Sequence, residues 1–363
     1  MNPIDLSIIV PTYNERDNIG ELSNRIAKEL PSVNWELIFV DDNSPDGTAI
    51  IAQQLGRIDP RVRCIRRVGR RGLASACIEG MLSSNARFFI VMDADFQHDP
   101  SSLPGMYNLL LSNSADLVIA SRYMAGGTVS DWDERRKTMS RLATRLAKII
   151  CSRPVSDPMS GFFGLKREVM DACLMELSTI GFKILLDIIA SSGKHIRISE
   201  VPLQFSSRAK GQSKLNFNVM WEYILLILDK LFGKYIPVRF MAFATVGVIG
   251  IFVHMVVLAL FFKGIGLQFA MSQAIATGVA IIFNYTLNNI LTYAGHTLKG
   301  ISWIKGLFSF SLICGIGAIA NVGAANYLFS NNFQWALAAV AGIVLSAVWN
   351  YAVTAQYTWS AKT

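Results

Sequence analysis

The apolar run at residues 88–92 is followed by two carboxylates and an amide, Asp93, Asp95 and Gln97. Such a run is typical of a buried strand that opens into a polar loop at its carboxyl end. Carboxylate and amide oxygens suit a hard divalent cation such as Mg²⁺ or Mn²⁺, which takes its remaining ligands from water and substrate phosphates. Asp95 and Gln97 are therefore candidate metal ligands. An ordinary acidic turn after a buried strand is the alternative for this motif taken alone.

Two earlier apolar runs, residues 6–10 and 35–40, predict buried parallel strands that are separated by a helix beginning near Asn18. The carboxyl ends of parallel strands lie at one edge of an open sheet, where ligands bind. We therefore expect three strand ends to point at one site. The polar residues that follow the first two strands are Tyr13 and Glu15, and Asp41 and Asp42.

Basic residues stand where such a site would meet phosphate groups. The turn at residues 69–72 carries two arginines between glycines, which suits a phosphate or a base but also a solvated loop. Arg122 ends a further predicted strand at residues 117–121. Residues 126–140 begin with glycines and become basic, so this segment could close as a mobile loop over an anionic acceptor.

The composition indicates two domains, one of them in a membrane. The chain has 363 residues, is 52% hydrophobic and carries a net charge of +8, and its mean hydropathy is +0.37. Residues 1–215 have a mixed, charged composition, whereas residues 236–359 carry few charges. Lipid headgroups and phosphorylated substrates explain the positive charge, and we expect no nucleic-acid partner. Five widely spaced cysteines and an N-terminus without a signal peptide predict a reduced, cytoplasmic first domain.

Short motifs along the first two-thirds of the chain occur in a characteristic order. They are Pro11-Thr12-Tyr13-Asn14-Glu15, Val40-Asp41-Asp42, Asp93-Ala94-Asp95, Ser121-Arg122-Tyr123, Asp157-Pro158, Ser160-Gly161-Phe162-Phe163, Gly181-Phe182-Lys183 and Arg208 with Gly211, Ser213 and Lys214. This order resembles the dolichol-phosphate mannose synthases, inverting family 2 glycosyltransferases with the GT-A fold, a Rossmann-like α/β fold. The resemblance covers residues 5–230, and the apolar half looks like the GtrA-like membrane domain that is fused to some members. The Gln-x-x-Arg-Trp motif of processive synthases is absent, which favours a single transfer.

The resemblance implies a role for each matching residue. Asp95 and Gln97 would bind Mg²⁺ or Mn²⁺, and Arg136 and Ser140 would bind the acceptor phosphate. The residues expected to carry catalysis are Asp95, Arg122, Lys183, Arg208 and Lys214. The residues expected to bind the nucleotide sugar are Pro11, Tyr13, Glu15, Val40, Asp42, Asp93, Ala94, Asp95, Gln97, Arg122, Lys183, Arg208 and Lys214.

The chemistry of a lipid phosphate agrees with these roles. A phosphate monoester has a second pKa of about 6, so it is mostly dianionic at neutral pH and is already a nucleophile. Catalysis would then depend on placing its oxygen in line with the anomeric carbon and on neutralising the departing nucleoside diphosphate. The sequence offers cations for this and no obvious nucleophile-base set, and none of the four histidines is assigned a catalytic role. His98 either packs in the core or supports the neighbouring site residues.

The apolar half predicts an interfacial helix and four membrane spans. The amphipathic helix runs from Asn216 to Gly233, and its Trp221 and Lys230, with the following Lys234, suit a membrane interface. Each span is long enough for a hydrocarbon core of roughly 30 Å. The expected spans are 238–262, 269–293, 304–329 and 333–359, and the expected domains are 1–215, 216–235 and 236–363.

Charge and repetition predict how the spans are arranged. Lys and Arg precede the first span and lie between the second and third, so the catalytic domain and both termini are expected in the cytoplasm. Asn284-Tyr285 recurs 66 residues on as Asn350-Tyr351, which indicates two duplicated hairpins. Six glycines would permit close helix contact, namely Gly247, Gly250, Gly278, Gly315, Gly317 and Gly342. The asparagines either pack between helices or line a polar groove for a lipid phosphate.

These observations predict a multi-pass membrane enzyme that transfers mannose from GDP-mannose to dolichyl or polyprenyl phosphate, with oligomer formation left open. UDP-glucose or another nucleotide sugar is an alternative donor, because the Asp-x-Asp-x-Gln motif predicts binding of metal and phosphate and does not identify the sugar. A flippase for lipid-linked sugars is the alternative from a different class. The intact acidic and basic residues of the first domain argue against it.

Overall fold

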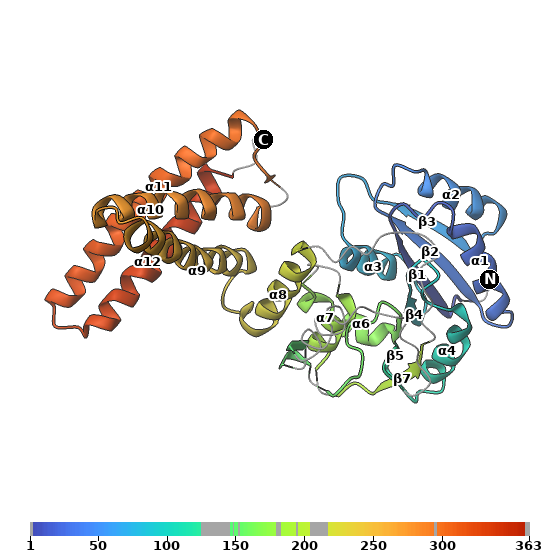
Figure 1. Cartoon of the computed structure of the whole chain (residues 1–363). Helices are drawn as coiled ribbons and strands as arrows, with labels where there is room; N and C mark the ends of the chain where they lie inside the picture. Colours follow the sequence, from blue (N-terminus) through green and yellow to red (C-terminus); the bar gives the residue numbers. More distant parts are fainter. Residues whose placement is uncertain are drawn as a thin grey trace. The chain divides into compact units, whose positions relative to one another are not determined.

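The structure, a computed structural model, describes residues 3–124, 146–147, 149–151, 153–178, 183–193, 195–203, 217–293 and 296–359. Packing divides the chain into two compact units, Met1–Leu231 and Phe232–Thr363. The first unit is built around one sheet, and the second consists of long apolar helices (Figure 1).

The sheet of the first unit has its strands in the order β3-β2-β1-β4-β6-β5-β7. Strand β6 runs antiparallel to its neighbours β4 and β5, and the other pairs are parallel. The carboxyl ends of β1, β2, β4 and β5 therefore share one edge, as the apolar runs predicted. The strands are β1 (Leu6–Thr12), β2 (Trp35–Asp41), β3 (Val62–Arg66), β4 (Phe88–Val91), β5 (Leu117–Ser121), β6 (Phe163–Lys166) and β7 (Ile198–Pro202).

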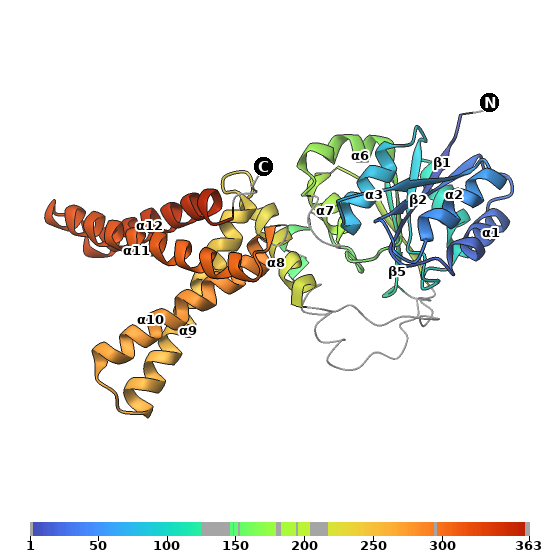
Figure 2. The same ribbon diagram turned by 90° about the horizontal axis from the view of Figure 1, so that it is seen from above.

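Helices cover both faces of this sheet (Figure 2). Alternate side chains of one strand point to opposite layers, so that Ile8 and Val10 join one core and Ile9 joins the other. Both faces of the sheet are buried, which explains why the strands have continuous apolar sequences. One layer contains α1 (Ile19–Glu29), α2 (Thr48–Ile58), η1 (Pro100–Ser102) and α4 (Leu103–Leu111), and the other contains α3 (Leu73–Leu82), α6 (Arg167–Cys173), η2 (Leu174–Glu176) and α7 (Ile184–Ser191).

The amphipathic helix predicted for Asn216–Gly233 is α8 (Phe217–Phe232), and it packs on the first unit. Its Tyr223 and Leu226 share a buried cluster with Leu186 of α7. Lys230, which we expected at a membrane interface, instead lies in a buried ion pair with Asp187. Part of the charge on this helix therefore stabilises the fold of the first unit.

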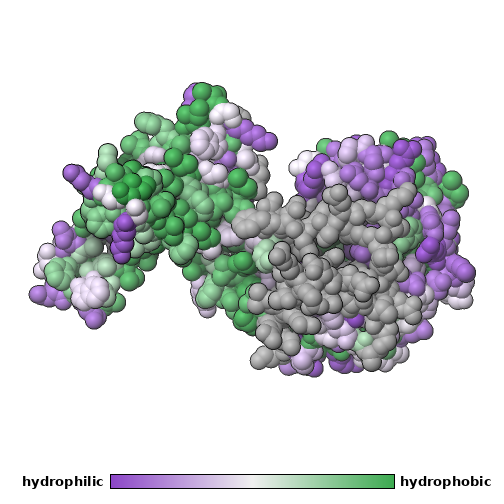
Figure 3. Space-filling view, in the orientation of Figure 1, coloured by the Kyte–Doolittle hydropathy of each residue, from purple (hydrophilic) through white to green (hydrophobic). Residues whose placement is uncertain are grey.

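The second unit contains four helices that are long and apolar enough to cross a membrane, within the part of the chain described. Its surface is largely apolar in Figure 3, as expected for side chains that face lipid. The candidate spans are Val238–Gly264, Phe269–Thr292, Ile301–Ser330 and Trp335–Tyr357. They correspond to α9 (Val238–Ala259) with η3 (Leu260–Gly264), α10 (Phe269–Leu287) with η4 (Asn288–Thr292), α11 (Ile301–Ser330) and α12 (Trp335–Tyr357). The prediction of four spans is confirmed.

An asparagine of one helix packs on a glycine of the other in both hairpins. A methyl group at Gly250 of α9 would overlap the Asn284 amide of α10, and one at Gly317 of α11 would overlap the Asn350 amide of α12. The predicted repeat therefore has a structural counterpart. The amide oxygens of both asparagines are buried against these glycines, where Cα–H groups offer weak hydrogen bonds.

A neighbouring asparagine is also used within the second unit. Asn289 Oδ1 accepts hydrogen bonds from the Leu298 amide at 2.8 Å and from Trp359 Nε1 at 3.0 Å. Trp359 in turn stacks on Tyr293 with ring centroids 4.2 Å apart. These contacts favour the packing interpretation of the asparagines over the polar groove.

We predict that Gly250→Ala lowers the melting temperature of the protein in detergent, because the added methyl group displaces the Asn284 amide. Overpacking of this kind costs about 1–3 kcal/mol. Gly247→Ala is the matched control on the same helix, since a methyl group there meets no described atom within 4 Å. Gly317→Ala and Gly315→Ala form the equivalent pair in the second hairpin. Equal melting temperatures within each pair would contradict the close contact.

Candidate active site

The loop after β1 is held by side chains of the loop after β2 and of the first residue of α2. Three successive backbone amides of the first loop donate to these polar side chains, and Asn14 adopts a left-handed conformation with φ 61°. This network fixes the backbone on which Tyr13 and Glu15 stand. The bonds are Asn14 N–H to Ser44 Oγ (3.0 Å), Glu15 N–H to Thr48 Oγ1 (3.0 Å) and Arg16 N–H to Asp46 Oδ2 (3.2 Å).

Asp42 organises the basic turn that follows β3. Its Oδ1 accepts from the Arg67 guanidinium at 2.7 Å, and its Oδ2 accepts from the Gly72 amide at 2.8 Å. Arg67 is only 2% exposed, so this is a buried, charge-assisted contact. The same turn places the Arg71 guanidinium over the Tyr13 ring, 4.8 Å from its centroid. The turn at residues 69–72 therefore lies next to the loop that follows β1.

The loop that carries the candidate metal ligands is closed by its own residues. The Asp93 amide donates to His98 Nδ1 at 3.0 Å, and the Gln97 amide donates to Asp95 Oδ1 at 3.1 Å. His98 is 3% exposed and stacks on Phe162 with ring centroids 5.3 Å apart. Because Nδ1 accepts a hydrogen bond, the ring carries its proton on Nε2. His98 therefore shapes the loop as well as packing on Phe162, so both interpretations of this residue apply.

Two predicted site cations lie in one electrostatic cluster with two carboxylates. Arg122 makes a bidentate ion pair with Asp157, at 2.7 Å from Nε and 2.9 Å from Nη2. Burial is the largest influence on Arg122 and opposes its charge, but the Asp157 hydrogen bonds together with the negative charges of Asp157 and its neighbours raise the pKa of the guanidinium. Burial lowers the pKa of Lys183, and the positive charge of Arg122 lowers it further, while Asp157 and Asp93 act in the opposite direction. The structure thus brings Asp93, Arg122 and Lys183 together.

The sequence motif contained Asp157 but gave no role for it. In the structure a residue of β7 holds the segment that carries Asp157. Glu200 Oε1 accepts from the Ser156 amide at 3.0 Å and from Ser156 Oγ at 2.8 Å. Asp157 is 1% exposed, so Arg122 reaches a carboxylate that water does not solvate. Arg67 and Glu200 were not predicted as part of the site, although Arg67 directly follows β3.

The donor atoms present fit a divalent cation that binds together with a substrate. Asp93, Asp95 and Gln97 supply carboxylate and amide oxygens from one loop, the ligand type preferred by Mg²⁺ and Mn²⁺. Among the residues described, no three His, Cys, Asp or Glu side chains form a ready-made metal cluster. The loop therefore suits a cation that takes part of its coordination from a diphosphate.

The remaining predicted residues fall into two groups. Pro11 pairs with Val40 between β1 and β2, and the side chains of Val40 and Ala94 are buried, at 0% and 2% exposure. These residues lie at the ends of the strands beneath the polar loops, and the side chains of Val40 and Ala94 have little exposed surface. The residues outside the described part of the chain are Arg136, Ser140, Arg208 and Lys214, and their roles stay predictions.

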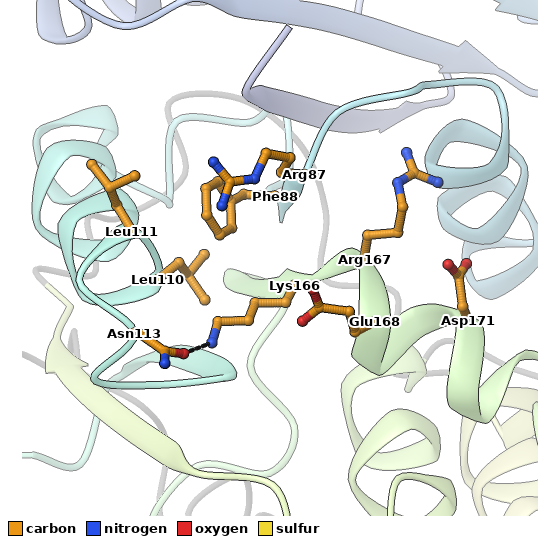
Figure 4. Close-up of a pocket in the computed structure, with 9 residues that line it drawn as sticks. All are labelled: Arg87, Phe88, Leu110, Leu111, Asn113, Lys166, Arg167, Glu168 and Asp171. Carbon is orange, nitrogen blue, oxygen red and sulfur yellow. Dashed lines mark hydrogen bonds between the residues drawn. The ribbon is translucent and has the colours of Figure 1, made fainter. Parts of the chain in front are cut away.

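A cavity of about 540 Å³ lies at the opposite edge of the sheet (Figure 4). It is lined by Phe88 at the start of β4 and Lys166 at the end of β6. Lys166 there binds Asn113 and an Asp116 carboxylate, the latter at 2.7 Å. This cavity is therefore distinct from the converging strand ends.

Comparisons with known proteins agree with the motifs. Residues 7–174 match the model of Glycosyl transferase family 2, and residues 242–359 match that of the GtrA/DPMS transmembrane domain. The chain is 37% identical to a dolichol-phosphate mannosyltransferase of Pyrococcus furiosus over 358 residues, 98% of this chain and 99% of the relative. The chain belongs to the dolichol-phosphate mannosyltransferase family. The predicted family and the GT-A class, a Rossmann-like catalytic sheet followed by membrane helices, are confirmed, and the protein is a glycosyltransferase.

Two fungal relatives and a solved structure are also similar to the chain. The Mycosarcoma maydis dolichol-phosphate mannosyltransferase is 36% identical over 70% of this chain and 86% of its own length. The Saccharomyces cerevisiae enzyme of the same name is 36% identical over 61% and 85%. The structure of glucosyl-3-phosphoglycerate synthase from Mycobacterium tuberculosis with Mn²⁺, UDP-glucose and phosphoglyceric acid is 19% identical, covers 62% of this chain and 79% of its own, and has a TM-score of 0.46.

We predict that His98→Ala lowers kcat/KM for transfer by roughly 10- to 100-fold, because the loop with Asp93, Asp95 and Gln97 loses its internal acceptor. His98→Asn should retain more activity, since the amide oxygen can take the place of Nδ1. His195→Ala, at an exposed position, is the matched control. Steady-state kinetics on the purified variants measure the effect. An unchanged His98→Ala enzyme would show that the imidazole only packs.

Proposed function

We propose that the protein transfers mannose, with inversion, from GDP-mannose to dolichyl or polyprenyl phosphate. The observation that carries this proposal is the match over almost the full length of both chains to the Pyrococcus furiosus dolichol-phosphate mannosyltransferase. The glycosyltransferase chemistry and the membrane domain follow from the family, whereas the donor, the acceptor and the stereochemistry belong to the proposal.

The acceptor phosphate supplies the nucleophile in this reaction. One of its oxygens forms a bond to the anomeric carbon while the bond from that carbon to the diphosphate oxygen breaks. Attack from the face opposite the leaving group inverts the anomeric configuration. No protein base is needed, because the dianionic phosphate carries no proton that must be removed.

The cations of the site face the charge that develops on the diphosphate. Arg122 is held by Asp157, so its guanidinium is preorganised and does not reorient during the reaction. Lys183 is partly buried beside it, and an ammonium in such a place gains from a new anionic neighbour. Asp95 and Gln97 would hold a divalent cation, which supplies further neutralisation of the diphosphate.

The acceptor would approach from the membrane. Arg136 and Ser140 match the acceptor loop of the family, and the four candidate spans make the protein a multi-pass membrane protein. Lys299 lies between the second and third spans and Lys305 lies near the start of the third, whereas the following hairpin loop has no Lys or Arg. This charge bias supports a cytoplasmic catalytic unit and cytoplasmic termini.

The donor and product are tested by incubating the purified protein in detergent with polyprenyl phosphate and one labelled nucleotide sugar at a time. We expect a mannosyl phospholipid from GDP-mannose, with the β configuration by NMR, and little product from UDP-glucose. Product from UDP-glucose alone would establish the alternative donor. Because detergent offers no bilayer to cross, transfer in it would separate an enzyme from a flippase.

Removal of divalent metal tests the second part of the proposal. EDTA should abolish transfer, and added Mg²⁺ or Mn²⁺ should restore it. Asp95→Asn should lower kcat by roughly 10²- to 10³-fold with little change in melting temperature, because the residue serves charge stabilisation and not the core. Asp171→Asn, an exposed carboxylate of α6, is the control. Full turnover in EDTA would contradict the metal role.

A further inference from the structure

The last turn of α8 is joined to α7 by a buried ammonium group. Lys230 Nζ lies 2.5 Å from Asp187 Oδ1, 2.9 Å from Ser191 Oγ and 2.5 Å from the Glu176 carbonyl. Its side chain is only 10% exposed. A lysine ammonium has three donors, and here each has an acceptor. The contact is therefore directional, unlike the apolar packing that surrounds it.

Asp187 connects this ammonium to the start of α7. Its Oδ2 accepts from the Ser178 amide at 2.8 Å, and its backbone amide donates to the Lys183 carbonyl at 3.1 Å. Asp187 thus ties α8 to the segment after η2 through its carboxylate, and it is bonded to the first turn of α7 through its backbone amide. It is 1% exposed, so the ion pair is shielded from solvent.

The first turn of α7 carries a cation of the active site. Lys183 is the N-cap residue of this helix, and no side chain caps the helix end. The ammonium of Lys183 lies within the electrostatic reach of Arg122, Asp157 and Asp93. A shift of this turn would move the ammonium relative to the other site charges, and small displacements of positioned groups cost much of the rate.

Apolar contacts alone would hold α8 less specifically. Tyr223 and Leu226 pack on Leu186, and such contacts tolerate rotation or sliding of a helix. A buried ion pair is satisfied in few arrangements, so it can specify one of them. The chain continues from α8 directly into the apolar unit that begins at Phe232.

We propose that Lys230 is a positioning residue for glycosyl transfer, because its ion pair with Asp187 fixes the start of α7 and thereby places Lys183. A displacement of α8 is then transmitted to the active site through this pair. The inference rests on the proposed function, in which Lys183 faces the diphosphate of the donor.

The test compares single and double variants of the full-length protein in detergent. Lys230→Met should lower kcat about tenfold and leave KM for the lipid phosphate within about twofold of wild type. Lys230→Arg should keep most activity, since a guanidinium can still pair with Asp187. Lys234→Met removes an exposed lysine four residues further on and should match wild type.

A double-mutant cycle separates positioning from general destabilisation. In a Lys183→Met background, Lys230→Met should cause no further loss of transfer, although it lowers the melting temperature in both backgrounds. Losses that multiply would overturn the proposal. Wild-type transfer by Lys183→Met would instead refute the role of Lys183 in the proposed function, which is a distinguishable result.

Folding of the variants is controlled by removing both charges. If Lys230→Met fails to fold, Asp187→Asn with Lys230→Met leaves no unpaired buried charge and keeps the protein folded. This double variant should show the same roughly tenfold loss of kcat. Wild-type kcat in the folded double variant would show that the ion pair does not place Lys183.

Discussion

Parallel strands of one sheet must end at the same edge, and the active site depends on this constraint. The loops after β1, β2, β4 and β5 are separated along the chain, yet the sheet brings them together. Carboxylates at that edge then accept hydrogen bonds from neighbouring loops, as Asp46 accepts from the Arg16 backbone amide and Asp42 accepts from the Arg67 guanidinium. The sheet is a rigid support, and these hydrogen bonds fix the positions of the charged groups on it.

Charges of opposite sign are placed together at this edge before a substrate enters. Among the described residues, Arg122 and Lys183 are opposed by Asp93 and Asp157. This arrangement makes burial of the cations tolerable, since isolated charges cost far more in a low dielectric. A nucleoside diphosphate adds negative charge that the two cations alone do not neutralise. A divalent cation on the loop of Asp95 and Gln97 would complete the neutralisation.

Local sequence patterns predicted the features that depend on neighbouring residues. The apolar runs that became β1, β2 and β5, the polar loops after them and the four spans could all be read this way. Strands β6 (Phe-Gly-Leu-Lys) and β7 (Ile-Ser-Glu-Val-Pro) were not predicted, because Gly, Pro and polar residues interrupt them and neither is a continuous apolar run. The partners of charged residues could not be predicted, because they lie far away in the sequence. Asp157 is 35 residues from Arg122, and Lys230 looked interfacial because its partner Asp187 lies on another helix.

The most direct test of the central claim is to locate the metal. A crystal or cryo-EM structure of the protein with Mn²⁺ and a non-transferable GDP-mannose analogue would show it, with anomalous scattering to identify the ion in a crystal. The account predicts one Mn²⁺ bound to Asp95, within coordination distance of Gln97 and of a diphosphate that also contacts Arg122 and Lys183. A nucleotide bound at another edge of the sheet, or bound at this edge with Mn²⁺ absent from the Asp95 loop, would contradict it.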